Sequence, residues 1–298
     1  MSKLIANLDS SFSKYALAAG TGLTIGYLLS RLVFCSSSAS KSKETDYYET
    51  RKLLDEYLAM HFGKELDLLQ YKFFPAQALE FPQRCADQCI KHYQNTTPRR
   101  ALDIGCAVGA SSFDLARCFD EVVGIDYSQS FINACNELKK KGRMDYSIIN
   151  EGDLTKPCTA EIPADIDRSR VHFQCGDACN LPTNLGQFGC VLAANLICRL
   201  PDTRAFLYRL PSLVAAGGIL VITSPYTWLE QFTPKDKWIG GYLDKDGKPV
   251  TGFDTLKSIL GTHFDLIDDE NMQFFIRETA HKNQWSVAHC TIWKRKEN

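Results

Sequence analysis

Three acidic side chains stand where they could bind the hydroxyl and amino groups of a ligand. Asp103 precedes the loop glycines Gly105 and Gly109, Asp126 closes a second apolar segment, and Asp177 follows a third. The carboxyl ends of parallel strands meet at one edge of an open α/β sheet, and a carboxylate after the second strand is suited to ribose hydroxyls. The pattern predicts a site for a nucleoside cofactor.

The loop between Gly105 and Gly109 decides which cofactor is expected. A dinucleotide requires a G-x-G-x-x-G turn whose backbone amides face the pyrophosphate, and this loop has no such turn. Asp103 would repel a pyrophosphate but could hold a cationic amino-acid group. S-adenosylmethionine carries that group and no phosphate, so we predict S-adenosylmethionine as the cofactor.

The loop resembles motif I of class I S-adenosylmethionine-dependent methyltransferases, with Ala107 where the middle glycine of the motif often stands. Asp177 alone could simply cap a turn. The glycine loop, Asp126, the pair Gly176-Asp177 and Asn195 nevertheless follow one another in the order that the family has, which favours the cofactor interpretation. The resemblance implies a Rossmann-like, doubly wound α/β fold with a seven-stranded sheet. The residues that it implies for cofactor binding are Asp103, Gly105, Cys106, Ala107, Gly109, Asp126, Tyr127, Asp177, Ala178 and Asn195.

Apolar segments and helical segments alternate beyond Arg100. This alternation is typical of a doubly wound sheet. The last two strands are expected at 263–268 and 285–294, with the final strand antiparallel to its neighbours. The central strands are expected at 101–104, 122–126, 171–175, 190–194 and 218–223, and the crossover helices at 128–140 and 202–215.

Composition limits the class of function. The chain has 298 residues, 45% of them hydrophobic and 23% charged, which suits one catalytic domain with an extension. A net charge of -1 gives no electrostatic basis for a nucleic-acid partner. The twelve cysteines lie mostly in apolar segments without zinc-ligand spacing. Reduced thiols and no bound metal are therefore expected.

The N-terminal region has a separate organisation. Residues 15–34 are long and apolar enough to be a candidate transmembrane anchor, between a tail at 1–14 and a linker at 35–46. Basic residues are denser after the segment, so we expect membrane attachment with the catalytic domain, 47–298, in the cytosol; the alternative is a cytoplasmic protein. A helix over 47–62 should cover the site or the sheet, and an insertion at 141–170 should form a hairpin or flap near the substrate mouth.

Longer runs of sequence bear on the methyl acceptor, namely 193–201, 224–230, 275–278 and 284–288. These runs resemble the C-terminal methyltransferase domain of ovothiol synthases, which N-methylates 4-mercaptohistidine, also numbered 5-thiohistidine. The iron-dependent, sulfur-inserting domain of those synthases has no counterpart in this sequence, so the resemblance implies a separate sulfur-inserting enzyme upstream.

On this hypothesis the substrate is a small imidazole amino acid. Tyr226 and Trp228 are predicted to set the ring plane, and Arg199 or Arg277 to hold the carboxylate, with Glu278 near the amino group. Trp228 could instead be a core aromatic, and Arg277 with Glu278 a surface ion pair. Histidine or another small molecule is the alternative acceptor, and cofactor binding without turnover is the alternative function. No two of the six histidines have the spacing of metal ligands, and only His281 or His289 could reach the pocket.

Overall fold

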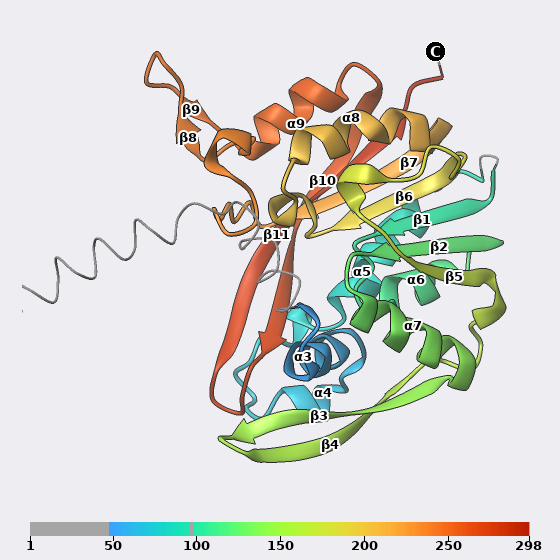
Figure 1. Ribbon diagram of the computed structural model, residues 1–298, viewed down its shortest axis with the longest axis vertical. Helices are drawn as coiled ribbons and strands as arrows, with labels where there is room; N and C mark the ends of the chain where they lie inside the picture. The colour runs from blue at the N-terminus through green and yellow to red at the C-terminus, as the bar shows by residue number, and fades with distance from the viewer. Residues whose placement is uncertain (1–47, 96–97, 298) are drawn as a thin grey trace, which may run out of the picture. The chain divides into compact units, whose positions relative to one another are not determined.

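The computed structural model describes residues 48–95 and 98–297, which lie within one compact unit, Asp46–Asn298. A seven-stranded sheet in the order β10-β11-β7-β6-β1-β2-β5 forms its centre, with α8 and α9 on one face and α5, α6 and α7 on the other (Figure 1). The predicted α/β doubly wound fold is confirmed. The helices are α3 Arg51–Phe62, α4 Glu65–Leu68, α5 Phe81–His92, α6 Ala110–Leu115, α7 Gln129–Lys141, α8 Thr203–Leu213 and α9 Gly252–Leu260.

The strands pair as the sequence pattern predicts. The parallel pairs are β1 with β2, β1 with β6, β2 with β5 and β6 with β7, whereas β11 runs antiparallel between β7 and β10. The central strands β6 and β7 are buried along most of their length, as expected for strands covered on both faces. The strands are β1 Arg100–Ile104, β2 Glu121–Asp126, β3 Arg143–Glu151, β4 Leu154–Glu161, β5 Val171–Cys175, β6 Phe188–Ala194, β7 Val214–Ser224, β8 Tyr242–Leu243, β9 Pro249–Val250, β10 Phe264–Arg277 and β11 Asn283–Arg295.

Side-chain caps begin the two predicted crossover helices. The Ser128 hydroxyl accepts the Phe131 N–H at the start of α7, and the Asp202 carboxylate accepts the Ala205 N–H at the start of α8. The second helix ends at Leu213, earlier than the expected end at 215. The chain is already extended there, and the glycine pair that should have ended the helix lies instead at an irregularity in the pairing of β6 with β7.

The structure has two long hairpins, one with strands longer than expected and one that the sequence predicts within 141–170. β10 and β11 continue beyond His289, the partner of Ser224 at the end of β7, as far as Asn283, which is about 20 Å at the usual strand rise. The insertion forms the hairpin of β3 and β4. Arg277 donates to the Ile149 carbonyl at 2.7 Å and to Oδ1 of Asn150 at 2.8 Å, so the two hairpin ends are joined.

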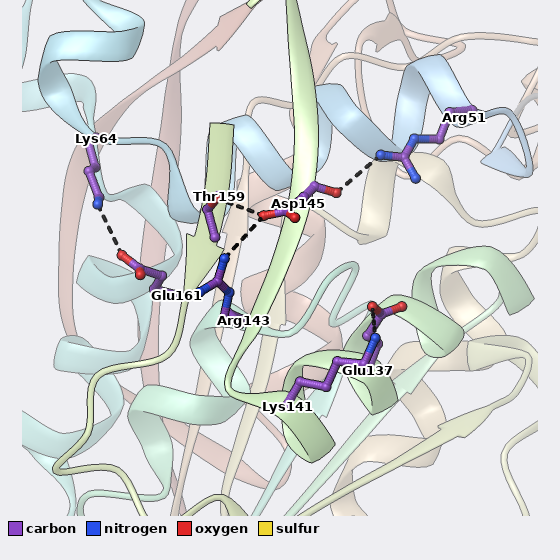
Figure 2. Close-up of polar contacts among 8 residues, drawn as sticks. All are labelled: Arg51, Lys64, Glu137, Lys141, Arg143, Asp145, Thr159 and Glu161. Atoms are coloured by element: carbon purple, nitrogen blue, oxygen red, sulfur yellow. Dashed lines mark hydrogen bonds and ion pairs between the residues drawn. The ribbon is translucent and has the colours of Figure 1, made fainter. Parts of the chain in front are cut away.

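Helix α3 lies between the two hairpins (Figure 1) and is bound to both. The Arg51 guanidinium donates to the Asp145 carbonyl at 3.3 Å, and Lys64, just after α3, pairs with Glu161 at 3.0 Å (Figure 2). Exposed ion pairs of this kind contribute little to stability. The buried side chains of Leu54 and Leu58 make the larger contribution to holding α3 in place.

Other elements were not anticipated, or fall outside the described part of the chain. The helices α5 and α9 and the short pair β8 and β9 had no expectation attached to them. The candidate anchor at 15–34, the tail at 1–14 and the linker at 35–46 lie outside the described residues. Across 48–95 and 98–297, the structure contains no helix with the length and apolar character required for a membrane span.

Replacing Arg277 with glutamine should lower the stability of the folded protein. Arg277 is 4% exposed and its guanidinium donates to the Ile149 carbonyl and to the Asn150 side chain, so Arg277→Gln removes charge-assisted hydrogen bonds made from a buried position. We expect a loss of about 2–4 kcal/mol in the free energy of unfolding, measured by denaturant titration. Lys282→Gln, at an exposed position in the turn between β10 and β11, is the matched control and should change stability by less than about 0.5 kcal/mol. Equal effects would contradict the joining role of Arg277.

Candidate cofactor and acceptor site

The loop between β1 and α6 is tied to the end of β2. The backbone N–H groups of Gly105 and Cys106 both donate to the Ile125 carbonyl, at 2.8 and 3.1 Å. Gly105 has φ +76°, and a Cβ there would lie 2.9 Å from Leu196 Cδ1. Both the backbone conformation and the close approach of Leu196 therefore require glycine.

Ala107 adopts a left-handed backbone conformation, which favours the glycine that the motif usually has at this position. Its φ is 48°, in the left-handed region, which costs an L-residue about 1–2 kcal/mol. Its N–H donates to Oδ2 of Asp126 at 2.9 Å, and the Cys135 thiol donates to its carbonyl at 3.2 Å. These bonds hold the loop in place despite the methyl group. The neighbouring Cys106 is buried and faces the core.

Asp126 holds the loop and still has capacity for a ligand. Oδ1 accepts the Ser128 N–H at 2.9 Å, while Oδ2 accepts the Ala107 N–H. Burial raises the pKa of this carboxyl, and the backbone donors partly oppose the rise. Each carboxylate oxygen can accept a second hydrogen bond, so the group fits a pair of ribose hydroxyls. Tyr127, which follows, is 61% exposed.

Asp103 is the most deeply buried acid of the site, at 1% exposure. The Ser112 hydroxyl donates to its Oδ2 at 2.7 Å. Burial raises the pKa of Asp103 to about 7, with a smaller rise from the negative charge of Asp126. A cationic ligand group would favour the ionised carboxylate. The residue therefore fits the amino-acid portion of S-adenosylmethionine.

The turns after β5 and β6 complete the edge. Oδ1 of Asp177 accepts the Cys179 N–H at 2.8 Å, so Asp177 does cap a turn, and its other carboxylate oxygen is left out of that bond. The neighbouring Ala178 is buried. Asn195 has φ 51°, and its Oδ1 accepts the Thr223 hydroxyl at 3.0 Å, which ties the end of β6 to β7.

Helix α3 and the residues before it contact this edge, as predicted for 47–62. The Ser128 hydroxyl donates to the Tyr48 carbonyl at 3.1 Å, and the Ala110 N–H donates to Nδ1 of His61 at 3.4 Å. Burial lowers the pKa of His61 to about 3, so the ring is neutral and can accept this bond. The sequence pattern does not predict this role of His61, because its partner is a backbone group 49 residues further along the chain.

Arg199, one of the predicted acceptor residues, is bonded to the segment after β7 that also carries Tyr226. Nη1 of Arg199 donates to the Thr227 carbonyl at 3.1 Å, next to Tyr226, and the guanidinium lies 4.8 Å from the Phe232 ring centroid. Trp228 is 8% exposed and packs in the core beneath α9, which matches its alternative interpretation as a core aromatic.

Arg277 and Glu278 lie elsewhere. Arg277 is the last residue of β10 and lies about 20 Å along the hairpin of β10 and β11 from the level at which β7 ends, and its guanidinium is bonded to the β3 and β4 hairpin. Glu278 accepts from Gln284 and pairs with Lys282. These contacts do not bring the pair to Tyr226, so carboxylate and amino-group binding there stays an untested prediction.

A surface hollow at the base of the β3 and β4 hairpin is a weaker candidate for a ligand site. Lys64, Lys141, Arg143 and Glu161 are among its lining residues. Each basic group faces a carboxylate: Lys64 faces Glu161, Lys141 faces Glu137, and Arg143 faces Asp145 (Figure 2). The hollow therefore offers little unpaired positive charge to an anion.

Comparison with known proteins identifies the class of enzyme. Residues 102–222 match a family model described as a methyltransferase domain. The chain is 25% identical over 245 residues to a probable S-adenosylmethionine-dependent methyltransferase of Saccharomyces cerevisiae, covering 72% of this chain and 77% of the relative. The chain is an S-adenosylmethionine-dependent methyltransferase. The predicted activity and cofactor are thus confirmed, while the acceptor is left open.

Two further similarities concern a shorter segment and the fold. The methyltransferase is 25% identical over 128 residues to ajmaline N-methyltransferase of Rauvolfia serpentina, covering 43% of this chain and 36% of that relative. It also resembles the structure of magnesium protoporphyrin IX methyltransferase from Synechocystis PCC 6803 with bound S-adenosylhomocysteine. That similarity has a TM-score of 0.53 at 17% identity and covers 86% of this chain and all of the other. It shows the class I methyltransferase fold.

Replacing Asp103 with asparagine should separate cofactor binding from stability. The pKa of Asp103 is raised from 3.8 to about 7, so the free folded protein loses stability as pH rises through this window. Asp103→Asn removes the ionisation and should be more stable than wild type by up to about 4 kcal/mol above pH 7, with little difference near pH 4.

The same variant should bind S-adenosylmethionine at least about tenfold more weakly, because a charged partner is lost. Denaturant titration at the two pH values and calorimetric titration of the cofactor measure the two effects. Asp120→Asn, at an exposed carboxylate paired with Arg99, is the control and should show neither. Unchanged cofactor affinity in Asp103→Asn would contradict the assignment.

Proposed function

We propose that this methyltransferase acts on a ring nitrogen of a small imidazole amino acid, with 5-thiohistidine, also called 4-mercaptohistidine, as the first candidate. The observation that carries the proposal lies at the carboxyl edge of the sheet, where Arg199 donates to the carbonyl of Thr227, the residue after Tyr226. Leu196, three residues before Arg199, lies against Gly105 of the cofactor loop. A guanidinium and a phenol at that edge suit an acceptor with a carboxylate and a planar polar ring. The sequence runs at 193–201 and 224–230 that resemble ovothiol synthases include both residues.

Arg199 retains capacity for the acceptor carboxylate. In the described part of the chain, its hydrogen bonds to Cys198 and Thr227 all use Nη1. Nη2 and Nε can then meet a carboxylate as a fork. The Phe232 ring beneath the guanidinium fixes the plane of that fork by a cation–π contact.

The chemistry requires orientation of the acceptor. Bound S-adenosylmethionine supplies the methyl group, and an imidazole nitrogen is already nucleophilic when neutral. Holding the acceptor by its carboxylate at Arg199, with its ring beside Tyr226, can contribute much of the rate through alignment. The same alignment must turn the sulfur of 5-thiohistidine away, because a thiolate is the stronger nucleophile.

The acceptor is tested by methyl transfer from labelled S-adenosylmethionine to 5-thiohistidine and to histidine in parallel. We expect the label on a ring nitrogen of 5-thiohistidine, identified by mass spectrometry and NMR, with slower transfer to histidine. Transfer to histidine alone would show that histidine, and not 5-thiohistidine, is the acceptor. Transfer to sulfur would contradict the ring-nitrogen assignment.

Arg199→Gln should weaken acceptor binding selectively. Loss of a charge-assisted, bidentate contact predicts an increase of about 10- to 100-fold in the acceptor KM. The dissociation constant of S-adenosylmethionine should change by less than about twofold, since Arg199 has no predicted contact with the cofactor. Arg209→Gln on α8, whose guanidinium bonds the Pro182 carbonyl, is the control and should leave both constants unchanged. Equal losses for the two ligands would contradict this role.

Residues 15–34 are proposed as a membrane anchor that keeps the catalytic domain in the cytosol. The support is the apolar length of that segment and the denser basic residues that follow it. A separate enzyme that inserts sulfur into histidine would then supply the acceptor.

A further inference from the structure

A chain of three polar side chains begins at Tyr226 and ends at solvent. The Tyr226 hydroxyl lies 3.0 Å from Nδ1 of His289, and Nε2 of His289 lies 2.9 Å from Oδ2 of Asp269. The side chain of His289 is 16% exposed and that of Asp269 is 49% exposed. The three residues come from three places, the end of β7, β11 and β10, so only the folded sheet brings them together.

The direction of the hydrogen bonds follows from the terminal carboxylate. An ionised Asp269 can only accept, so Nε2 of a neutral His289 carries the hydrogen. Nδ1 is then the acceptor, and the Tyr226 hydroxyl must donate to it. The remaining lone pairs of the phenolic oxygen are left to accept a hydrogen bond from a ligand.

Tyr226 is held in an unusual conformation. Its φ is 52°, which is rare for a bulky residue and costs on the order of 1–3 kcal/mol. Its N–H donates to the Ser224 hydroxyl at 3.0 Å, and its ring lies so close to Gly252 that a Cβ there would be 2.7 Å from Cδ1. The Phe253 ring packs edge-on against His289 with centroids 4.6 Å apart. Surrounding structure thus fixes both rings.

The chain of residues lies at the edge that carries the cofactor loop. His289 is paired with Ser224, the last residue of β7, and Thr223 is bonded to Asn195 at the end of β6. Leu196 in turn contacts Gly105. At the usual strand spacing the ends of β7 and β1 are about 10 Å apart, a distance that a cofactor and a small acceptor together can span.

We propose that Tyr226, His289 and Asp269 form a proton relay that removes the proton lost by the methyl acceptor, with Tyr226 touching the acceptor. His289 and Asp269 act through Tyr226 and are positioning residues. The relay rests on the methyltransferase activity and deepens the proposed function, because it suits an acceptor that carries a proton, such as an imidazole with a ring N–H. An ionised thiolate would gain nothing from it.

The step balances in atoms and charge. One ring nitrogen forms a bond to the methyl carbon as the carbon–sulfur bond breaks, and that electron pair stays on sulfur. The proton on the acceptor passes to the Tyr226 oxygen while the original phenolic proton passes to Nδ1 of His289. The positive charge that leaves sulfur is thus replaced by an imidazolium beside Asp269, whose exposed carboxylate opens to water.

The electrostatic surroundings are consistent with this role. Burial raises the pKa of the Tyr226 phenol, and the charges of Asp269 and Asp254 raise it further, so the resting group is protonated. On α9, Asp254 is paired with Lys257, whose ammonium lies 4.5 Å from the Phe253 ring centroid. A phenol of high pKa gives up its proton only when a neighbour accepts it, and His289 is that neighbour.

A second hydrogen-bonded Tyr–His pair elsewhere in the protein serves as a matched control. Tyr71 and His281 form a second Tyr–His pair at 2.9 Å, with His281 in the turn between β10 and β11, away from the cofactor edge. Replacing either residue removes the same kind of hydrogen bond. Tyr71→Phe and His281→Gln should therefore leave methyl transfer within about twofold of wild type.

The test uses the full chain in single-turnover assays with labelled S-adenosylmethionine and saturating 5-thiohistidine, histidine or imidazole. Tyr226→Phe and His289→Gln should each lower the rate of nitrogen methylation by about 100-fold, with the cofactor dissociation constant unchanged. The double variant should fall no further than the single ones, because the residues act as one unit. Methylation of the sulfur of 5-thiohistidine should persist in the variants.

Three results would overturn the relay: multiplying losses in the double variant, a parallel loss of sulfur methylation, or a rate loss that disappears when the acceptor concentration is raised. If histidine or imidazole is methylated and 5-thiohistidine is not, the acceptor proposal fails and the relay is judged on the acceptor that reacts. If no probe reacts, the ¹⁵N spectrum of His289 decides: a hydrogen on Nε2 with Nδ1 accepting from Tyr226 supports the relay, and the reverse tautomer overturns it.

Discussion

Three consecutive N–H groups of the loop after β1 donate to the end of β2, two to the Ile125 carbonyl and one to the Asp126 carboxylate. These bonds require the left-handed conformations of Gly105 and Ala107, and they fix the distance between the two parallel strands that carry Asp103 and Asp126. Every other part of the site is positioned relative to this loop. The end of β6 contacts it through Leu196, and α3 contacts the helix that follows it through His61.

The two hairpins act on the site indirectly. Their ends are joined by Arg277, and α3 lies between them, so the helix at the cofactor edge is supported by both hairpins (Figure 1). A buried guanidinium without hydrogen-bond acceptors would be strongly destabilising, so the folded protein depends on the bonds between Arg277 and the β3 and β4 hairpin. The orientation of α3 therefore depends on a contact far from the chemistry.

The acceptor side has a different character. Asp269, His289 and Tyr226 connect the outer antiparallel strands to the end of β7, and Arg199 connects β6 to the same segment. A parallel sheet alone would supply the cofactor edge, because its carboxyl ends converge there. The antiparallel pair β10 and β11 adds titratable groups beside that edge. The fold thus separates the groups predicted for the cofactor from those proposed for the acceptor.

The sequence by itself determined the local part of this protein. Asp103, Gly105 and Asp126 could be predicted as cofactor residues because the prediction depends on short spacings within strand–loop–helix units, and the sheet followed from alternating apolar segments. Tertiary structure decided what depends on partners distant in sequence. It buried Trp228 in the core, joined Arg277 to the insertion, and paired His289 with Tyr226. Strand register sets these contacts, and no periodicity within one segment encodes which distant side chains a register will bring together.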